Sequence, residues 1–273
     1  MTRWRSPRMS DDELIVTAIS VIFGPLAWLI WLFNLSRPRR LDGRTSDLPW
    51  VTLTLALCTG LIFNVLRTSA SFDVRDNELY LFMYVVLGLA WLRLAEPFFA
   101  YLGLSARDDV IERRNRAATM ALAGAMVGVA CCYAGGTVGD GPGWWAVVLA
   151  AGLATATLVM VWMLFAQATS IVDAITIGRD PSAGWRLSGL LIACGVLLGR
   201  SVAGDWTSAH QLIADWVRWL PLVAAIVAVA LLFERAARPR PERPLAPVFA
   251  LGMLPATVEV GAAIIALWNS WRG

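Results

Sequence analysis

A single carboxylate lies inside a long apolar stretch of this sequence, Glu259 in "LPATVEVGAAIIAL". Placing a charged side chain near the centre of a membrane helix costs about 2.5–3.5 kcal/mol or more, so such residues usually pair or serve a function. Pro255, four residues earlier, crowds the carbonyl of Leu251 and weakens the helix there. A carboxylate beside a loosened turn suits a proton or cation relay. The structural alternative is that Glu259 is protonated or pairs with an arginine of another span.

Two further ionisable residues, Arg93 and Glu96, lie late in another apolar stretch. Their spacing of three residues puts them on one helix face, where they can pair directly. Near the end of a membrane helix such side chains also reach the interface by snorkelling. We therefore interpret this pair as structural.

No group of residues in the sequence resembles an enzyme active site. The chain has one histidine, His210, in an expected loop, and four cysteines without a CxxC pair. It has no phosphate-binding glycine loop, nucleophile elbow or metal-ligand spacing. We therefore expect no catalytic residue, no cofactor and no metal. The net charge of +3 is too small to indicate nucleic acid as a partner.

The composition identifies the elements that position these residues. Of 273 residues, 58% are hydrophobic and only 16% are charged, against about 25% in soluble domains. A bilayer core needs roughly 20 apolar residues of helix per crossing. The sequence therefore predicts an all-α polytopic membrane protein with eight spans, at 14–34, 48–67, 79–101, 117–138, 144–167, 183–203, 211–234 and 245–268.

An internal repeat organises these spans. At an offset of 65, Arg114 matches Arg179 and Asn115 matches Asp180. Asn and Asp are good helix N-caps, so both pairs are expected to mark the entry of a helix into the membrane. Fainter copies flank these two, which predicts four tandem parallel helical hairpins. The expected divisions are a polar segment 1–13 and hairpins 14–67, 79–138, 144–203 and 211–268.

A glycine recurs at a similar depth in the second span of every hairpin. These residues are Gly60, Gly124, Gly189 and Gly252, and the residue four positions after Gly124 is Gly128. Small residues at this spacing let helices approach closely in lipid. We expect the glycine-bearing spans to be inner, tightly packed helices. The alternative is that the glycines line a pore or permit the helices to slide.

The arginines predict an orientation, because cytoplasmic loops are rich in them. The loops within the hairpins carry fourteen: Arg37, Arg39, Arg40, Arg44, Arg107, Arg113, Arg114, Arg116, Arg179, Arg186, Arg235, Arg238, Arg240 and Arg243. The opposite side carries seven: Arg3, Arg5, Arg8, Arg67, Arg75, Arg200 and Arg272. The hairpin loops are therefore expected in the cytoplasm and both termini outside.

The segments "ARDDVIERRNRAATMALAGAMVGVA" and "DAITIGRDPSAGWRLSGLLIACGVLLGRSVAGD" resemble DUF350, a family of bacterial inner-membrane proteins of unknown function. Its unit is a hairpin with an acidic, arginine-bearing loop, an Asn before paired alanines and an Ala-Gly helix. The second segment departs from this pattern at Asp180, where the family has Asn. The resemblance is clear over about 95–235. It implies a multi-pass protein of the bacterial inner membrane and supplies no activity and no catalytic residue.

Two functional hypotheses follow, and the sequence does not choose between them. The first is a small ion or solute transporter or channel with Glu259 at its centre. The second is a non-transporting envelope scaffold, whose cytoplasmic arginine loops dock a protein partner or anionic lipid. The bilayer is the expected environment in both, and self-association into a homo-oligomer stays open.

Overall fold

The computed structural model describes residues 9–42, 47–237 and 247–271, without the side chains of 37–42. Its helices are α1 (Asp11–Val21), η1 (Ile22–Leu26), α2 (Ala27–Asp42), α3 (Leu48–Ser69), α4 (Phe72–Arg75), α5 (Glu78–Tyr101), η2 (Ala106–Glu112), α6 (Arg116–Gly136), α7 (Trp144–Ala168), α8 (Ile171–Thr176), α9 (Pro181–Ser201), α10 (Ala209–Ala237), η3 (Phe249–Met253) and α11 (Leu254–Ser270). The η segments are π-helical. The described residues contain no strand.

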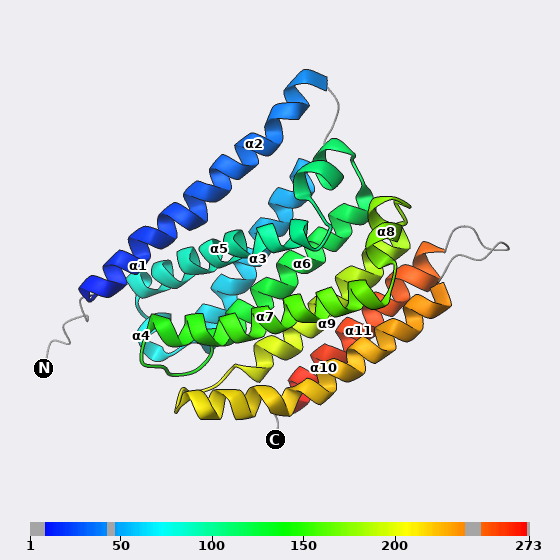
Figure 1. Cartoon of the computed structure of the whole chain (residues 1–273). Coiled ribbons are helices and arrows are strands. Elements are labelled where there is room, and N and C mark those ends of the chain that lie inside the picture. Colours follow the sequence, from blue (N-terminus) through cyan, green and yellow to red (C-terminus); the bar gives the residue numbers. More distant parts are fainter. Residues whose placement is uncertain (1–8, 43–46, 238–246, 272–273) are drawn as a thin grey trace, which may run out of the picture.

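Eight helical segments within the described residues are long and apolar enough to cross a membrane, which confirms the predicted fold class. They are Asp11–Ser36, Leu48–Ser69, Glu78–Tyr101, Arg116–Gly136, Trp144–Ala168, Pro181–Ser201, Ala209–Ala237 and Phe249–Ser270. Their ends differ from the predicted spans by a few residues. The beginning of α1 and the end of α11 lie at the same end of the bundle (Figure 1).

Helices α6 and α9 form the centre of the bundle and pack along each other (Figure 1). Helix α3 packs on α6, and α11 packs on α9. Helix α5 covers α3 and α6, α7 covers α6 and α9, and α10 covers α9 and α11. Helices α1 and η1 pack on the outside of α5. The chain thus places the helices of one hairpin beside those of the next.

Glycines bring the backbones of the central helices together. A Cβ added to Gly124 of α6 would overlap the Cα of Ser188 on α9. One added to Gly128 would lie 2.5 Å from the carbonyl oxygen of Leu191. At the contact between α9 and α11, a Cβ added to Gly189 would lie 2.5 Å from the Cα of Ala256. Close approach of this kind increases the van der Waals contact between helices. This contact matters in a bilayer because lipid tails are as apolar as the side chains, so no hydrophobic effect drives the helices together.

Two expectations about the glycine-bearing spans are wrong. A Cβ at Gly60 of α3 would meet nothing within 4 Å, so this glycine does not pack against another helix of the described chain. Most residues of α6 and α9 are buried, but only a minority of those in α3 and α11 are. The reason is position, because α3 and α11 lie at the two ends of the row and each has one uncovered face.

The two middle hairpins repeat each other in backbone structure. Where α6 and α9 end, extended segments lie side by side and bond in parallel: Gly204 N donates to the Val138 carbonyl at 3.1 Å, and Trp206 N donates to the Asp140 carbonyl at 2.7 Å. Gly139 N also donates to the Ser69 carbonyl after α3, at 3.3 Å. Equivalent residues thus lie next to one another. The division of the chain into four tandem hairpins stays a prediction.

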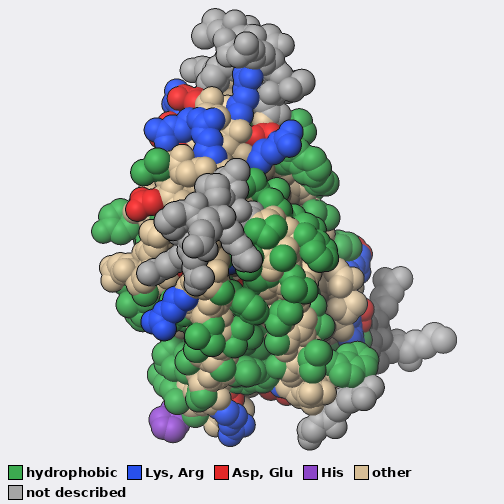
Figure 2. Space-filling model, turned by 90° about the vertical axis from the view of Figure 1, so that its right-hand side faces the viewer, with side chains coloured by type: hydrophobic (Ala, Val, Ile, Leu, Met, Phe, Trp, Pro, Cys, Tyr) green, Lys and Arg blue, Asp and Glu red, His purple; other side chains and the backbone are tan. Residues whose placement is uncertain are grey.

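The surface has the distribution expected of a protein in a bilayer. Figure 2 shows a broad face of mostly hydrophobic side chains, with arginines and carboxylates gathered mainly toward one end. Several of the exposed side chains on the outer helices are large and apolar, among them Ile15, Leu29, Leu232 and Ile265. Such residues suit lipid contact, since an exposed apolar surface of this extent is unusual in soluble monomers.

The glycine packing predicts a difference between two matched substitutions. Gly124→Ala forces a methyl group into the backbone of α9, and we expect a loss of about 1–3 kcal/mol of stability from overpacking. The measurement is thermal unfolding of purified protein in detergent micelles, with the folded fraction recorded as a function of temperature. Gly60→Ala is the control and is expected to leave stability unchanged or slightly raised, because Ala favours helix. Equal melting temperatures of the two variants would contradict the close contact of Gly124 with α9.

Candidate functional site

The predicted carboxylate lies near the middle of the last span and is enclosed by protein. Glu259 is 1% exposed, on the face of α11 that packs against α9. Neither of its carboxylate oxygens has a hydrogen-bond partner among the described residues. Arg186 and Cys194 on α9 are close enough to interact with it electrostatically. An ionised carboxylate without a donor is costly to bury, so Glu259 is expected to hold a proton in this arrangement.

Arg186, early in α9, holds a network of charges next to this carboxylate. Its Nε donates to Glu234 Oε2 of α10 at 2.7 Å. Its Nη1 donates to Ser182 Oγ at 3.1 Å and to the carbonyl of Leu251 at 2.7 Å. Its Nη2 lies 3.9 Å from Asp180 Oδ2. Arg186 and Glu234 are both buried, so this guanidinium links three membrane helices through charge-assisted bonds.

The backbone of the last span is shaped to meet Arg186. Pro255 has no N–H, so it cannot donate to the Leu251 carbonyl one helical turn earlier. The segment before it, η3, is π-helical, and the Leu251 oxygen accepts from Arg186. Gly252 lies so close to α9 that an added Cβ would be 2.7 Å from the Cα of Ser182. The proline and the glycine thus let α11 approach α9 and bond to it.

The sequence interpretation missed the two strongest members of this cluster. It counted Arg186 among the loop arginines, but the residue lies in the second turn of α9 and is 4% exposed. It gave Glu234 no role, although this residue is 5% exposed near the end of α10. The available signal was their position, because both charges fall within predicted spans. What the sequence did not give is which helices lie side by side.

Arg93 and Glu96 lie elsewhere in the molecule, on α5, which does not pack on α11. Arg93 Nη1 donates to Glu96 Oε2 at 3.0 Å, so the pair forms as the spacing suggested. The Arg93 guanidinium also lies 5.9 Å from the centre of the Trp31 ring. The ion pair and the ring contact support a structural role, although Arg93 Nε is buried without a hydrogen-bond partner among the described residues.

The repeated loop residues adopt the same conformation twice. Arg114 and Arg179 both have a left-handed backbone with φ of 51°. The residue after each caps a helix: Asn115 accepts from the amides of Ala117 and Ala118, and Asp180 accepts from that of Ser182. A left-handed non-glycine residue costs roughly 1–2 kcal/mol, so the capped geometry must hold it in place.

The two caps differ in their further contacts. The Asn115 amide donates to the carbonyl of Ile175 at 2.6 Å and so ties the first loop to α8. The Asp180 carboxylate instead accepts from Ser182 Oγ and faces Arg186. Asp180 is the residue at which the sequence departs from the Asn of the repeat. The departure thus coincides with the charge cluster.

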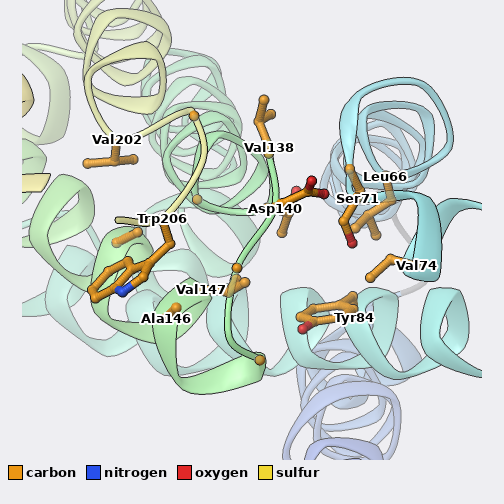
Figure 3. A pocket seen from close by; sticks show the side chains of 18 residues that line it. Leu66, Ser71, Val74, Tyr84, Val138, Asp140, Ala146, Val147, Val202 and Trp206 are labelled. Atoms are coloured by element: carbon orange, nitrogen blue, oxygen red, sulfur yellow. The ribbon is translucent and has the colours of Figure 1, made fainter. Parts of the chain in front are cut away.

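A pocket at the end of the bundle opposite the Arg186 network is too small for a ligand. It lies where α3, α6 and α9 end, and Figure 3 shows Ser71, Tyr84 and Asp140 around it. Its free space of about 50 Å³ compares with roughly 300–1,000 Å³ for ligand pockets. Space of this size suits a few waters, which would satisfy the polar groups at its rim.

The chain matches a known family over the central part of its sequence. The family model for DUF350, a domain of unknown function, matches residues 73–202. This match confirms the resemblance that the sequence suggested, and it covers α5, α6, α7 and α9 together. Glu234 and Glu259 lie outside it. No curated protein and no solved structure matches the chain.

The Arg186 network predicts a non-additive effect of mutation. Arg186→Leu leaves Glu234 buried without its partner, and removal of one member of a buried pair costs about 3–5 kcal/mol. The double variant Arg186→Leu, Glu234→Leu should recover a large part of that loss, because the buried Glu234 charge is removed together with its partner. Denaturant titration in mixed micelles measures both.

The matched control is Arg218→Leu, which removes an arginine whose side chain is 78% exposed. We expect stability close to wild type, because exposed ion pairs contribute little. Additive losses in the double variant would refute the coupling between Arg186 and Glu234.

Proposed function

We propose that this protein transports protons, or a small solute together with protons, across the membrane, with Glu259 as the group that gains and loses the proton. The observation that carries the proposal is the buried carboxylate whose two oxygens have no hydrogen-bond partner among the described residues. Unpaired ionisable residues at membrane depth are costly, and in membrane proteins they commonly mark proton or ion paths.

The charge balance of the cluster supports this role. One guanidinium, that of Arg186, serves the carboxylates of Asp180 and Glu234 and also acts on Glu259. Full ionisation would leave three negative charges against one positive charge. A proton on Glu259 reduces the excess, and its release would draw Arg186 toward a second buried carboxylate. Binding of a proton and the packing of α9 against α10 and α11 are thereby linked.

The local backbone supplies the freedom that such a change requires. The π-helical η3 and Pro255 interrupt regular α-helical bonding just before Glu259. Irregular turns of this kind are common at functional sites in helices. The contact between Arg186 and the Leu251 carbonyl lies at this turn, so a change in Arg186 would act on the helix that carries Glu259.

The second candidate is a scaffold that docks a protein or anionic lipid through its arginine loops. The side chains of Arg107 and Arg113 are 65% and 55% exposed in the loop around η2, although both also pair with local carboxylates. On this hypothesis, neutralising Arg113, Arg114 and Arg116 removes a co-purifying partner, and Glu259→Gln changes stability alone.

We further propose the bacterial inner membrane as the location, with the hairpin loops in the cytoplasm and both termini outside. Several arginines behind this orientation lie outside the described residues, namely Arg3, Arg5, Arg8, Arg44, Arg238, Arg240, Arg243 and Arg272, and the side chains of Arg37, Arg39 and Arg40 are likewise not described. Arg107, Arg113, Arg114 and Arg179 do lie between paired spans, and Arg116 is the first residue of α6, next to the same loop. Their placement supports the proposal.

Proton flux tests the proposed function. We expect purified protein in liposomes to dissipate an imposed pH gradient, measured with an internal pH-sensitive dye, and Glu259→Gln to reduce the rate at least tenfold. The glutamine keeps the size of the side chain and removes the exchangeable acid. Sodium and potassium gradients are tested in the same way.

The control is Glu96→Gln, the same substitution at a carboxylate that already pairs with Arg93. It should leave flux near wild type at equal, folded incorporation. Flux that survives Glu259→Gln would exclude this residue from the path, and no flux from wild type for any of the three ions would count against ion transport.

Labelling of introduced cysteines tests the orientation. Glu112→Cys replaces the last residue of η2, between α5 and α6, and His210→Cys lies at the opposite end of the bundle. In intact cells a membrane-impermeant maleimide should label the second variant and not the first. Native Cys58, Cys132 and Cys194 are buried, and the half-buried Cys131 is replaced by alanine in both variants to keep the background low. The reverse labelling pattern would invert the topology.

A further inference from the structure

A second site, separate from the charge cluster, lies in a groove between the first turns of α3 and α6. It has about 540 Å³ of open space and includes Asp47, Trp50, Arg116, Met120, Ala123 and Trp185. None of these belongs to the Arg186 network. The groove is thus large enough for part of a small molecule, against roughly 300–1,000 Å³ for typical ligand sites.

The groove holds one carboxylate, that of Asp47, and one guanidinium, that of Arg116, and the two form no ion pair with each other. Asp47 is the N-cap residue of α3, yet its side chain makes no capping bond. Its Oδ2 accepts a long bond of 3.5 Å from Thr119 Oγ, which also donates to the Asn115 carbonyl at 3.1 Å. Arg116, the first residue of α6, is exposed and forms no ion pair among the described residues. Both charged groups are available to a ligand.

The remaining lining places this ligand at the membrane surface. Trp50 is 61% exposed and Trp185 is half-buried, each near the start of its helix. Tryptophan at helix ends favours the headgroup layer of the bilayer. Farther along α6, Met120 and Ala123 continue the groove as an apolar surface. A ligand here has a polar head at the level of Asp47 and Arg116 and an apolar body alongside α6.

We propose that this groove binds one bilayer phospholipid with a zwitterionic, primary-amine headgroup, of the phosphatidylethanolamine type. Arg116 meets the phosphate, for which a guanidinium is well suited. Asp47 accepts from the ammonium group, and the tryptophan rings offer faces to the same cation. An anionic headgroup without an amine would leave Asp47 facing a negative molecule. The acid in the groove therefore favours the zwitterion.

Lipid titration observed by native mass spectrometry tests this. The protein is released from detergent with matched acyl-chain forms of phosphatidylethanolamine, phosphatidylcholine, which has no ammonium N–H, and phosphatidylglycerol, which has no amine. A charge-assisted hydrogen bond corresponds to roughly a tenfold difference in affinity, so wild type should prefer the ethanolamine lipid by about that factor. Equal binding of the three lipids by wild type would overturn the proposal.

Variants separate the two charges. Asp47→Asn should abolish the preference and leave phosphatidylglycerol binding intact, and Arg116→Gln should weaken all three lipids. Asp47→Ser repeats the first test with a side chain that caps helices well, in case the amide disturbs folding. The control is Arg218→Gln, an exposed arginine of α10 outside the groove, which should change nothing. A preference that persists in Asp47→Asn and Asp47→Ser, or an Arg218→Gln effect equal to that of Arg116→Gln, would also refute the site.

Discussion

The close contact between α6 and α9 is the constraint on which the rest of this structure depends. In a bilayer, apolar side chains gain little by leaving lipid for protein, so helices associate through dispersion contacts and polar bonds. Gly124 and Gly128 remove the side chains that would separate the two backbones. With these helices fixed, α3 and α11 attach at the edges and α5, α7 and α10 cover one side. The same arrangement encloses Glu259, because α11 must follow the surface of α9.

The polar network has a different physical basis from the glycine contact. Arg186 needs acceptors because a buried guanidinium without partners is costly, and it obtains them from a carboxylate, a hydroxyl and a carbonyl freed by a proline. These acceptors come from α9, α10 and the start of the last span, so the arginine also ties α10, a helix without glycine, to the other two. Glu259 lies near a cation that makes three hydrogen bonds and yet has no donor of its own among the described residues. Among the buried side-chain atoms in the part of the chain that the structure describes, its two oxygens are the only carboxylate oxygens without a partner.

The sequence predicted the membrane spans well and the contacts between them less well. Uncharged runs define a span because charge is excluded from hydrocarbon, and the caps Asn115 and Asp180 could be identified because capping is local. The pairing of Arg93 with Glu96 was predictable for the same reason, as both lie on one helix. Arg186 and Glu234 are 48 residues apart, and their contact depends on the neighbours that α9 and α10 acquire on folding. Gly60 shows the converse, since a packing motif has an effect only where a second helix is present.

The backbone bonds at the ends of α3, α6 and α9 have a consequence for how such a chain can grow. In both bonds the later segment donates to the earlier one, from Gly139 to Ser69 and from Gly204 to Val138. Helices α3, α6, α9 and α11 contact one another in that order, so the described helices form an open row. An array of this kind resembles a solenoid, in which each unit contacts its neighbours and the number of units is set by chain length. Duplication of one hairpin would therefore lengthen the row at an edge, where α3 or α11 now faces lipid, and would leave the α6–α9 contact undisturbed.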